Sequence, residues 1–204
     1  HDLGLRTLVG KGQAIVSSTD LKTSTLQDLI DRAITMARNA PADPYCEIPS
    51  TESSSITQTD LELYDPIEIS PEDLFDLAAE TEDAARSVVG VTNSEGAEAT
   101  KNKGHIALAS STGFAAEYSI TNFGASVSVI AGQDTAMERD YEYSSTRFFE
   151  DLMTPSAIGK SAGEKAVARQ RPQKVKSQQV PVIFDPRLSG GLPRLLSGLI
   201  SGAS

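Results

Sequence analysis

The sequence is poor in the residues that most often carry catalysis or bind metals. Its 204 residues include one cysteine, two histidines and no tryptophan. Cys46 therefore has no intrachain disulfide partner, and no cysteine cluster is available for zinc. We interpret this thiol, in the turn-rich stretch APADPYCEIP, as incidental. His1 is the first residue and His105 is predicted to open a strand after a turn, so we do not expect histidine catalysis.

Long apolar runs and an excess of basic charge are also missing. No run approaches the roughly 18 apolar residues of a membrane helix, and HDLGLRTLVG lacks the pattern of a signal peptide. The formal net charge of -10 argues against nucleic-acid binding, which needs clustered Lys and Arg. The one basic tract, ARQRPQKVKSQQ at 168–179, is predicted to be a solvated linker. We expect a cytoplasmic protein with neither a membrane nor a nucleic-acid partner.

Common catalytic and phosphate-binding motifs are absent as well. The one G-x-S-x-G match, GKSAG at 159–163, falls inside a predicted helix and is therefore not a nucleophile elbow, which needs a strand-to-helix turn. GKGQ lacks the spacing of a P-loop and precedes a strand. In TNSEGAE, Ser94 and Glu95 lie beside Gly96, and a turn accounts for all three without any chemistry. Physical chemistry alone therefore predicts a soluble domain without an evident active site.

The first half of the sequence contains clear strand and helix patterns. Residues 3–9 and 13–18 are predicted strands joined by Gly10-Lys11-Gly12. A helix capped by Thr23 or Ser24 should follow. Its apolar face would consist of Leu26, Leu29, Ile30, Ala33, Ile34 and Ala37.

Residues 41–69 are rich in Pro, Ser, Thr and acids and are predicted to be a long surface excursion that lies against the body. Ser70-Pro71-Glu72-Asp73 has the chemistry of a helix start, with a cap, a proline at the first helical position and acids near the positive end of the helix dipole. This helix should reach about Ser87. It is expected to bury Leu74, Leu77, Ala78 and Ala85.

From Val91 to Tyr143 the pattern changes to short alternating runs. GHIALASSTG, FAAEYSITN and GASVSVIAG are punctuated by glycines, which predicts an antiparallel meander. Helical patterns return in SSTRFFEDL and PSAIGKSAGEKAVARQ, and QVPVIFDP predicts a late strand before an apolar helix. Because the strands are grouped between helices, we predict an α+β fold with a central antiparallel sheet flanked by helices.

The stretch AMERDYEYSS at 136–145 is the densest polar cluster. In a strand, Glu138, Asp140 and Glu142 would share one face. The other face would carry Met137, Arg139, Tyr141 and Tyr143. An arginine flanked by tyrosines can bind a carboxylate or a peptide backbone, whereas the simpler interpretation is a solvated acidic face with the arginine paired across it.

Six segments, in order over nearly the whole chain, resemble one family. They are VSSTDL (16–21), MARNAPADPY (36–45), VTNSEGAEA (91–99), SVSVIAGQDTAMERDYEYSS (126–145), VARQRPQKV (167–175) and VPVIFDPRLSGGL (180–192). They are similar to the TldD/PmbA family, long described as modulators of DNA gyrase and now treated as metallopeptidases. The set resembles the PmbA, or TldE, branch more than the TldD branch.

The resemblance implies where a zinc site would lie. In the TldD branch, the helix after the PVIFDP-like strand carries an H-E-x-x-x-H motif, and a later cysteine completes the zinc ligands. A gapless placement anchored on Gly191 puts this motif at residues 195–200, with Leu195, Leu196 and Ile200 in place of the first His, the Glu and the second His. The resemblance thus implies no catalytic residue and no metal or cofactor in this chain, with zinc held by a TldD-like partner.

The resemblance also implies a domain organisation. Residues 1–178 would form the N-terminal α+β domain, with its beginning missing. Residues 179–204 would start the next region, and a C-terminal β-rich domain would be absent.

The implied function is that of an accessory, zinc-free subunit of a TldD/TldE-type heterodimeric metallopeptidase that degrades or processes unfolded peptides. A homodimer is the other arrangement, and a non-enzymatic regulatory protein of the gyrase-modulator type is the alternative function. Peptide is expected to add to a sheet edge. The candidate residues for binding peptide or partner are Asn93, Glu95, Arg139, Asp140 and Tyr141.

Overall fold

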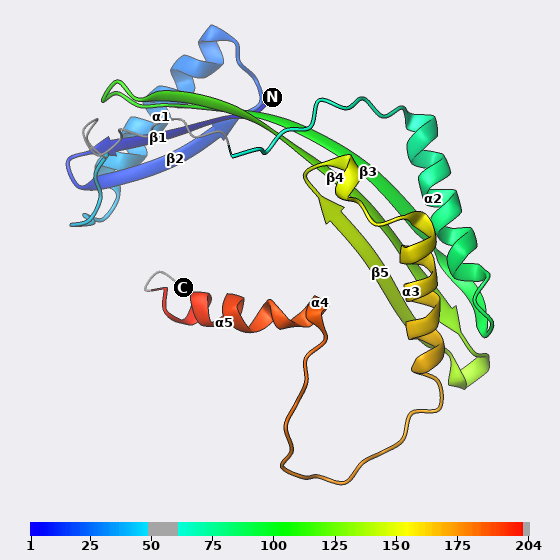
Figure 1. Ribbon diagram of the computed structural model, residues 1–204. Helices are drawn as coiled ribbons and strands as arrows, with labels where there is room; N and C mark the ends of the chain where they lie inside the picture. The colour runs from blue at the N-terminus through cyan, green and yellow to red at the C-terminus, as the bar shows by residue number, and fades with distance from the viewer. Residues whose placement is uncertain (49–60, 202–204) are drawn as a thin grey trace.

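The structure is a computed structural model that describes residues 1–48 and 61–201 (Figure 1). It contains a two-stranded and a three-stranded antiparallel sheet, with helices packed against them. This is the predicted α+β architecture. In the described ranges, no helix is both long and apolar enough to span a bilayer.

The N-terminal unit consists of β1 (Leu3–Val9), β2 (Gly12–Ser18) and α1 (Thr23–Asn39). Val9 pairs with Gly12, so the turn is one residue shorter than predicted, and Gly10 adopts a φ of 60°. Leu29 and Ala33 of α1 pack on Val16 of β2 and form a small core. The predicted strands and helix are therefore present.

The start of α1 differs from the prediction. Thr23 and Ser24 lie inside the helix, and the residue at the cap position, Lys22, makes no side-chain cap hydrogen bond. Instead the Asp20 carboxylate accepts hydrogen bonds from the Lys22 backbone N–H at 3.1 Å and the Thr25 hydroxyl at 3.0 Å. Asp20 thus fixes the turn that leads into α1, and the cap expected of Thr23 or Ser24 is wrong.

The segment before the second helix lies against the sheet, as predicted, although residues 49–60 of the expected excursion lie outside the described residues. The Leu63 carbonyl accepts from the Thr121 backbone N–H at 3.0 Å. Asp65 donates its backbone N–H to the Thr121 hydroxyl and accepts from the Phe149 N–H, both at 2.9 Å. These bonds fix the entry into α2.

Helix α2 (Pro71–Arg86) begins as the sequence predicts. Ser70 and Asp73 form a reciprocal capping box, and Pro71 is the first helical residue. Ala85 is buried as expected, together with Thr81. The three other residues expected in the core, Leu74, Leu77 and Ala78, are only half-buried.

The larger sheet has the order β3-β4-β5, with β3 (Val91–Ala109), β4 (Ala115–Ala131) and β5 (Glu138–Thr146). The short runs predicted between glycines are in fact two long strands. Gly104 and Gly124 are paired within the ladder, whereas Gly113 and Gly132 lie in the connections after β3 and β4 and have positive φ. His105 consequently lies inside β3, toward its C-terminal end, and not at a strand start.

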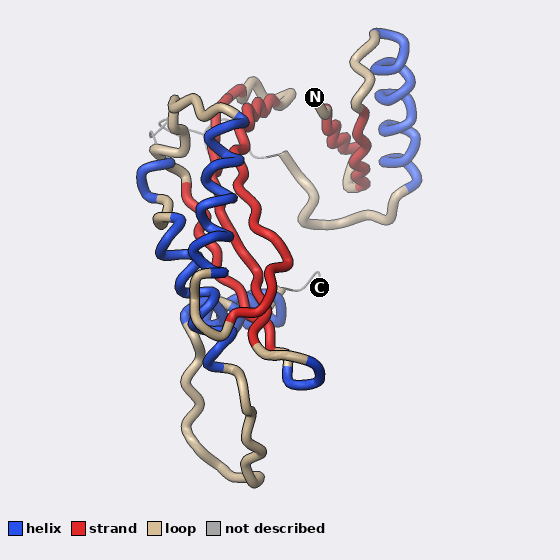
Figure 2. Tube along the Cα trace, turned by 90° about the vertical axis from the view of Figure 1, so that its right-hand side faces the viewer, coloured by secondary structure: helices blue, strands red, loops and turns tan. Residues whose placement is uncertain are grey.

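Helices α2 and α3 (Pro155–Ala168) run along one face of this sheet (Figures 1 and 2). The core between them contains Ala85, Ala125, Val127, Val129, Ala131, Ile158, Ala162 and Ala166. The expected helix in SSTRFFEDL is wrong. Strand β5 extends to Thr146, and only a single 3₁₀ turn, Phe149–Asp151, follows before α3.

The C-terminal segment leaves this domain as a long loop, drawn in tan in Figure 2. It ends in α4 (Pro186–Ser189) and α5 (Gly191–Leu199). The predicted strand in QVPVIFDP is wrong, since residues 173–185 contain no strand and pair with no neighbouring strand. Without a pairing partner, an alternating apolar sequence does not form a ladder.

Candidate functional site

The polar residues of β5 divide between its two faces as the alternation predicts. Asp140, Glu142 and Ser144 are buried, whereas Arg139 and Tyr141 are exposed. The acidic face is therefore not solvated, contrary to the simpler interpretation, because α3 covers it. A buried carboxylate requires charged or hydrogen-bonding partners, and both acids have them.

Glu142 is held by the middle of α3. Its Oε2 atom accepts hydrogen bonds from the Ser161 hydroxyl at 2.6 Å and from the Lys165 ammonium. These partners are four residues apart and share one face of the helix. The pair fixes the register between α3 and β5 at this point.

Asp140 is held by two arginines from different segments. Arg169, at the C-terminal end of α3, contacts Oδ2 at 3.3 Å, and Arg187 of α4 contacts Oδ1 at 3.0 Å. The Arg187 guanidinium also donates to the Tyr141 carbonyl at 2.7 Å and lies 5.0 Å from the centre of the Tyr141 ring. Asp140 and Tyr141 project to opposite faces of the strand, so Arg187 wraps around its outer edge.

These contacts keep both acids ionised. Burial opposes the charged form of Asp140, but the Tyr141 backbone N–H, Arg187 and Arg169 together hold its pKa below the ordinary value. Burial likewise opposes the charged form of Glu142, and hydrogen bonds from Lys165, Ser161 and the Tyr143 backbone N–H lower its pKa. The hydrogen bond to Asp140 raises the pKa of Arg187.

A β-bulge places Glu95 on the open face of the larger sheet, the side opposite α2 and α3. The register between β3 and β4 shifts between Ser94 and Gly96, so Glu95 is the extra residue, and Gly96 has a φ of 110°. The turn predicted for Ser94, Glu95 and Gly96 is therefore a bulge inside a strand. Glu95 accepts a hydrogen bond from the Ser128 hydroxyl at 2.7 Å and pairs with Arg139 at 3.2 Å. The Ser128 hydrogen bond, followed by Arg139, lowers the pKa of Glu95.

The open face is the side of the sheet opposite α2 and α3. The rings of Tyr141 and Tyr143 stack there, with 6.3 Å between their centres. Small residues of β4, Ser126 and Ser128, lie opposite these tyrosines in the ladder. The face therefore presents aromatic rings and the Glu95–Arg139 ion pair to solvent, a surface able to contact a peptide.

The five predicted peptide- or partner-binding residues do not form one cluster. Glu95, Arg139 and Tyr141 share the open face, whereas Asp140 faces α3. Asn93 lies at the start of the bulged stretch, where its side chain accepts from the Ser94 backbone N–H at 2.9 Å. Their roles in binding stay predictions.

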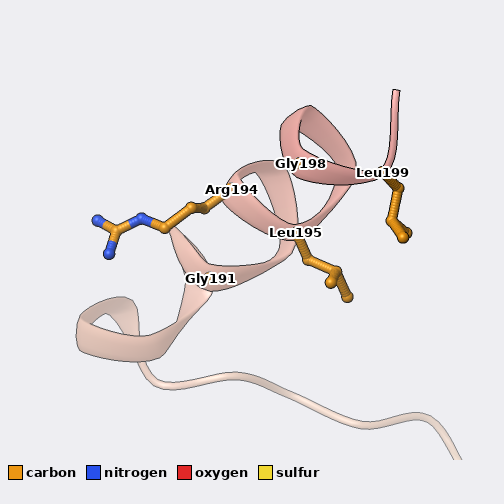
Figure 3. A pocket seen from close by; sticks show the side chains of 5 residues that line it. All are labelled: Gly191, Arg194, Leu195, Gly198 and Leu199. Atoms are coloured by element: carbon orange, nitrogen blue, oxygen red, sulfur yellow. The ribbon is translucent and has the colours of Figure 1, made fainter. Parts of the chain in front are cut away.

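Helix α5 and the residue that follows it carry the three positions aligned with the zinc motif. Leu195, Leu196 and Ile200 are 59%, 60% and 75% exposed. Figure 3 shows the shallow depression on this helix, lined by Gly191, Arg194, Leu195, Gly198 and Leu199. Its only charged side chain is an arginine, which is not a usual zinc ligand.

Sequence reasoning missed the partners of the buried acids. Ser161, Lys165 and Arg169 recur every fourth residue and so share one face of the helix beside its small and apolar residues, and this polar stripe was a usable signal for buried acids on the facing strand. Arg187 had no such signal, because it lies 47 residues from Asp140 in the sequence.

The larger sheet with α2 and α3 on one face forms the α+β domain to which the known family corresponds. The family model of the PmbA/TldA metallopeptidase central domain matches residues 64–170, which contain α2, β3, β4, β5 and α3. The chain therefore belongs to the PmbA/TldA metallopeptidase family.

Its relatives include proteins called metalloprotease PmbA. The one from Escherichia coli O157:H7 is 34% identical over 195 residues, covering 95% of this chain and 43% of that protein. The homologue from Haemophilus influenzae is 30% identical over 203 residues, covering 99% and 45%. The chain thus spans less than half the length of these relatives.

Solved structures share the fold. A candidate modulator of DNA gyrase from Bacteroides thetaiotaomicron aligns with a TM-score of 0.80 at 23% identity, covering 98% of this chain and 46% of that one. TldE from Thermococcus kodakarensis aligns with a TM-score of 0.60 at 13% identity, covering 80% and 36%. At these identities the likeness establishes the fold alone.

Proposed function

We propose that the protein is an accessory, zinc-free subunit of a TldD/TldE-type heterodimeric metallopeptidase that degrades or processes unfolded peptides in the cytoplasm. Membership of the PmbA/TldA family and the similarity to proteins called metalloprotease PmbA support a role in proteolysis. The similarity to relatives named PmbA also supports the PmbA, or TldE, branch.

The composition of α5 carries the proposal. Zinc binds to nitrogen, sulfur or oxygen atoms, and the side chains of Leu195, Leu196 and Ile200 have none. Within residues 1–48 and 61–201, no group of three or more His, Cys, Asp or Glu side chains could hold a metal ion. The residues aligned with the zinc motif thus do not fit the metal, and we assign no hydrolytic step to this chain.

In this proposal the chain contributes part of the wall of the peptide cleft. Tyr141 and Tyr143 offer aromatic rings, and the Glu95–Arg139 pair offers hydrogen-bond donors and acceptors to a peptide backbone. A strand added to a sheet edge binds mainly through main-chain hydrogen bonds, so the site would accept many sequences. This suits an enzyme whose substrates are unfolded peptides.

The proposal is tested by measuring zinc content and casein hydrolysis of the full-length protein, alone and mixed with the TldD-type subunit of the same organism. We expect no stoichiometric zinc and no hydrolysis from the protein alone, and hydrolysis on mixing. A TldD-type subunit whose motif glutamate is replaced by glutamine is the matched control and should give an inactive mixture. Zinc or hydrolysis with the protein alone would overturn the zinc-free assignment.

The alternative is a regulatory protein of the gyrase-modulator type, as the names of two similar solved structures suggest. A regulatory protein would bind its target without adding hydrolysis to any mixture. Failure to activate the TldD-type subunit, together with a direct effect on DNA supercoiling by gyrase, would favour this alternative. A homodimer that binds no TldD-type subunit would also contradict the heterodimer.

A further inference from the structure

The C-terminal segment makes little contact with the rest of the described chain. Every residue from 171 to 200 is exposed except Asp185 and Arg187, which are partly buried. The exposed residues include many apolar side chains of the loop and of α5. The only partly buried residues of this segment therefore lie at the start of α4.

Arg187 supplies the main polar contacts there. Its guanidinium donates to the Asp140 carboxylate at 3.0 Å and to the Tyr141 carbonyl at 2.7 Å, and Asp185 adds an electrostatic attraction to Lys165 of α3. Asp185 caps α4 by accepting from the Arg187 backbone N–H, and its carboxylate also lies 3.2 Å from the Arg187 Nε atom. The local cap therefore pre-orients the guanidinium toward β5.

The receiving site on β5 has partners of its own besides Arg187. Asp140 has only 7% of its side chain exposed, accepts from its neighbour's backbone N–H at 2.8 Å and contacts Arg169. Arg169 also lies 3.8 Å from Glu138. Arg187 itself is 19% exposed, so the pair is largely removed from solvent screening, unlike ordinary surface ion pairs.

The contacts to Tyr141 make the geometry specific. Its carbonyl points outward from β5, which is an edge strand of the sheet, and its ring lies on the open face. A planar guanidinium with several donors can satisfy a carboxylate and a carbonyl while stacking on a ring, whereas an ammonium cannot do all three. The contact thus defines both the position and the direction of α4.

We propose that Arg187 is the positioning residue of the C-terminal segment: its contacts with Asp140 and Tyr141 hold α4, and through it α5, at the outer edge of β5. That α5 thereby forms part of the peptide cleft rests on the proposed function, but the anchoring does not. Helix α5 continues from α4 after Gly190, so an anchor at Arg187 limits where α5 can lie.

The test is hydrogen exchange on the full-length protein carrying Arg187→Ala, Arg187→Lys or Lys174→Ala. In Arg187→Ala, the amides of residues 186–200 should exchange about tenfold faster, the change expected when a charged hydrogen bond is lost. Arg187→Lys should lie between this and the parent protein. Lys174 is an exposed cation of the same segment, so Lys174→Ala should exchange like the parent.

The result that would overturn the anchoring is unchanged exchange of residues 186–200 in Arg187→Ala, because something else would then hold the segment. Exchange in β4 and α2 serves as an internal check that the variant is folded. Casein hydrolysis by the mixed complex is a separate readout. Arg187→Ala should raise KM more than it lowers kcat if α5 lines the cleft. Faster exchange with an unchanged KM would keep the anchor and reject only the role in the cleft.

Discussion

At the scale of single residues, the molecule depends on two carboxylates buried between β5 and α3. Asp140 and Glu142 are 6% and 8% exposed, and each is matched by basic side chains. Burial of such acids is favourable only while their partners are present, because an unpaired buried charge is strongly destabilising. These two residues therefore make the domain sensitive both to substitution and to acid.

Glu142→Gln should make the protein less stable at neutral pH by about 1–3 kcal/mol, because it removes the charge that pairs with partly buried Lys165. The folded state lowers the pKa of Glu142 below its ordinary value of 4.5, so its contribution is present above that pH. This contribution is lost as the pH falls through the lowered folded-state pKa. Urea unfolding between pH 7 and pH 3 should show a shallower acid dependence for Glu142→Gln than for the parent.

Glu98→Gln is the matched control, since Glu98 is exposed on β3. It should change the free energy of unfolding by no more than about 0.5 kcal/mol. Equal stability of Glu142→Gln and the parent at pH 7 would show that the Lys165 pair contributes no net stability.

The sequence predicted which residues of β5 share a face, because alternation is a local property. It did not predict which face is buried. That depends on Lys165 and Arg187, which lie 23 and 47 residues from their acidic partners. The same limit explains why Asp140 was predicted to bind peptide or partner together with Glu95 and Arg139, whereas its side chain faces α3.

At the scale of elements, close packing of α2 against α3 shapes the domain. Gly159 and Gly163 of α3 are buried where the two helices meet. A Cβ atom on Gly159 would lie 2.7 Å from the Ala84 Cβ and 2.7 Å from the Ala85 backbone nitrogen. The helices are thus as close as a glycine allows, and a methyl group cannot fit without moving one of them.

Gly159→Ala should lower the free energy of unfolding by about 1–3 kcal/mol, because overpacking outweighs the higher helix propensity of alanine. Gly198→Ala in α5 is the control. A Cβ at that position meets nothing within 4 Å, so the change should be neutral or slightly stabilising. Thermal denaturation of both full-length variants measures the difference. A Gly159→Ala protein as stable as the parent would mean that α3 shifts freely over α2.

Elements with strong local signals were predicted well, and those that depend on pairing were not. The Ser70–Asp73 capping box marked the start of α2 to the residue. Gly104 and Gly124 suggested breaks, yet the ladder passes through both, since pairing with the opposite strand overrides the local preference of glycine. In the apolar stretch QVPVIFDP the local preference favours a strand, but no strand forms because no neighbouring strand pairs with it.

At the scale of the whole molecule, the described residues contain two separate cores. One lies between β2 and α1 around Leu29 and Ala33, and the other lies between the three-stranded sheet and α2 and α3. Each core is built from consecutive segments of the chain. We therefore expect the N-terminal unit and the central domain to respond independently to core substitutions.

Leu29→Ala should destabilise the N-terminal unit by about 2–4 kcal/mol, because it creates a cavity in a small core. Hydrogen exchange should accelerate in β1, β2 and α1. The amides of β4, which pack in the other core, should keep the rate of the parent. Accelerated exchange in both regions would show that the two cores unfold as one unit. Ile15→Ala, at a 68% exposed position of β2, is the control and should alter neither region.

Family membership, unlike the fold, came from resemblance and not from physical patterns. Composition and periodicity predicted an α+β chain without an evident active site, and nothing in charge or spacing alone pointed to proteolysis. The reason is physical. The side chains of the open face and of α5 are of common types, and their function depends on the molecules that they contact.

The two arginines that share Asp140 also have an order in time, because a ribosome makes Arg169 before Arg187. The central domain is built from consecutive segments and can close once α3 has emerged, with Arg169 already neutralising the buried carboxylate. Arg187 is synthesised 18 residues later (187 − 169) and joins a finished binding site on β5. The growing chain can thus bury Asp140 already paired with Arg169, before the segment around Arg187 docks on β5.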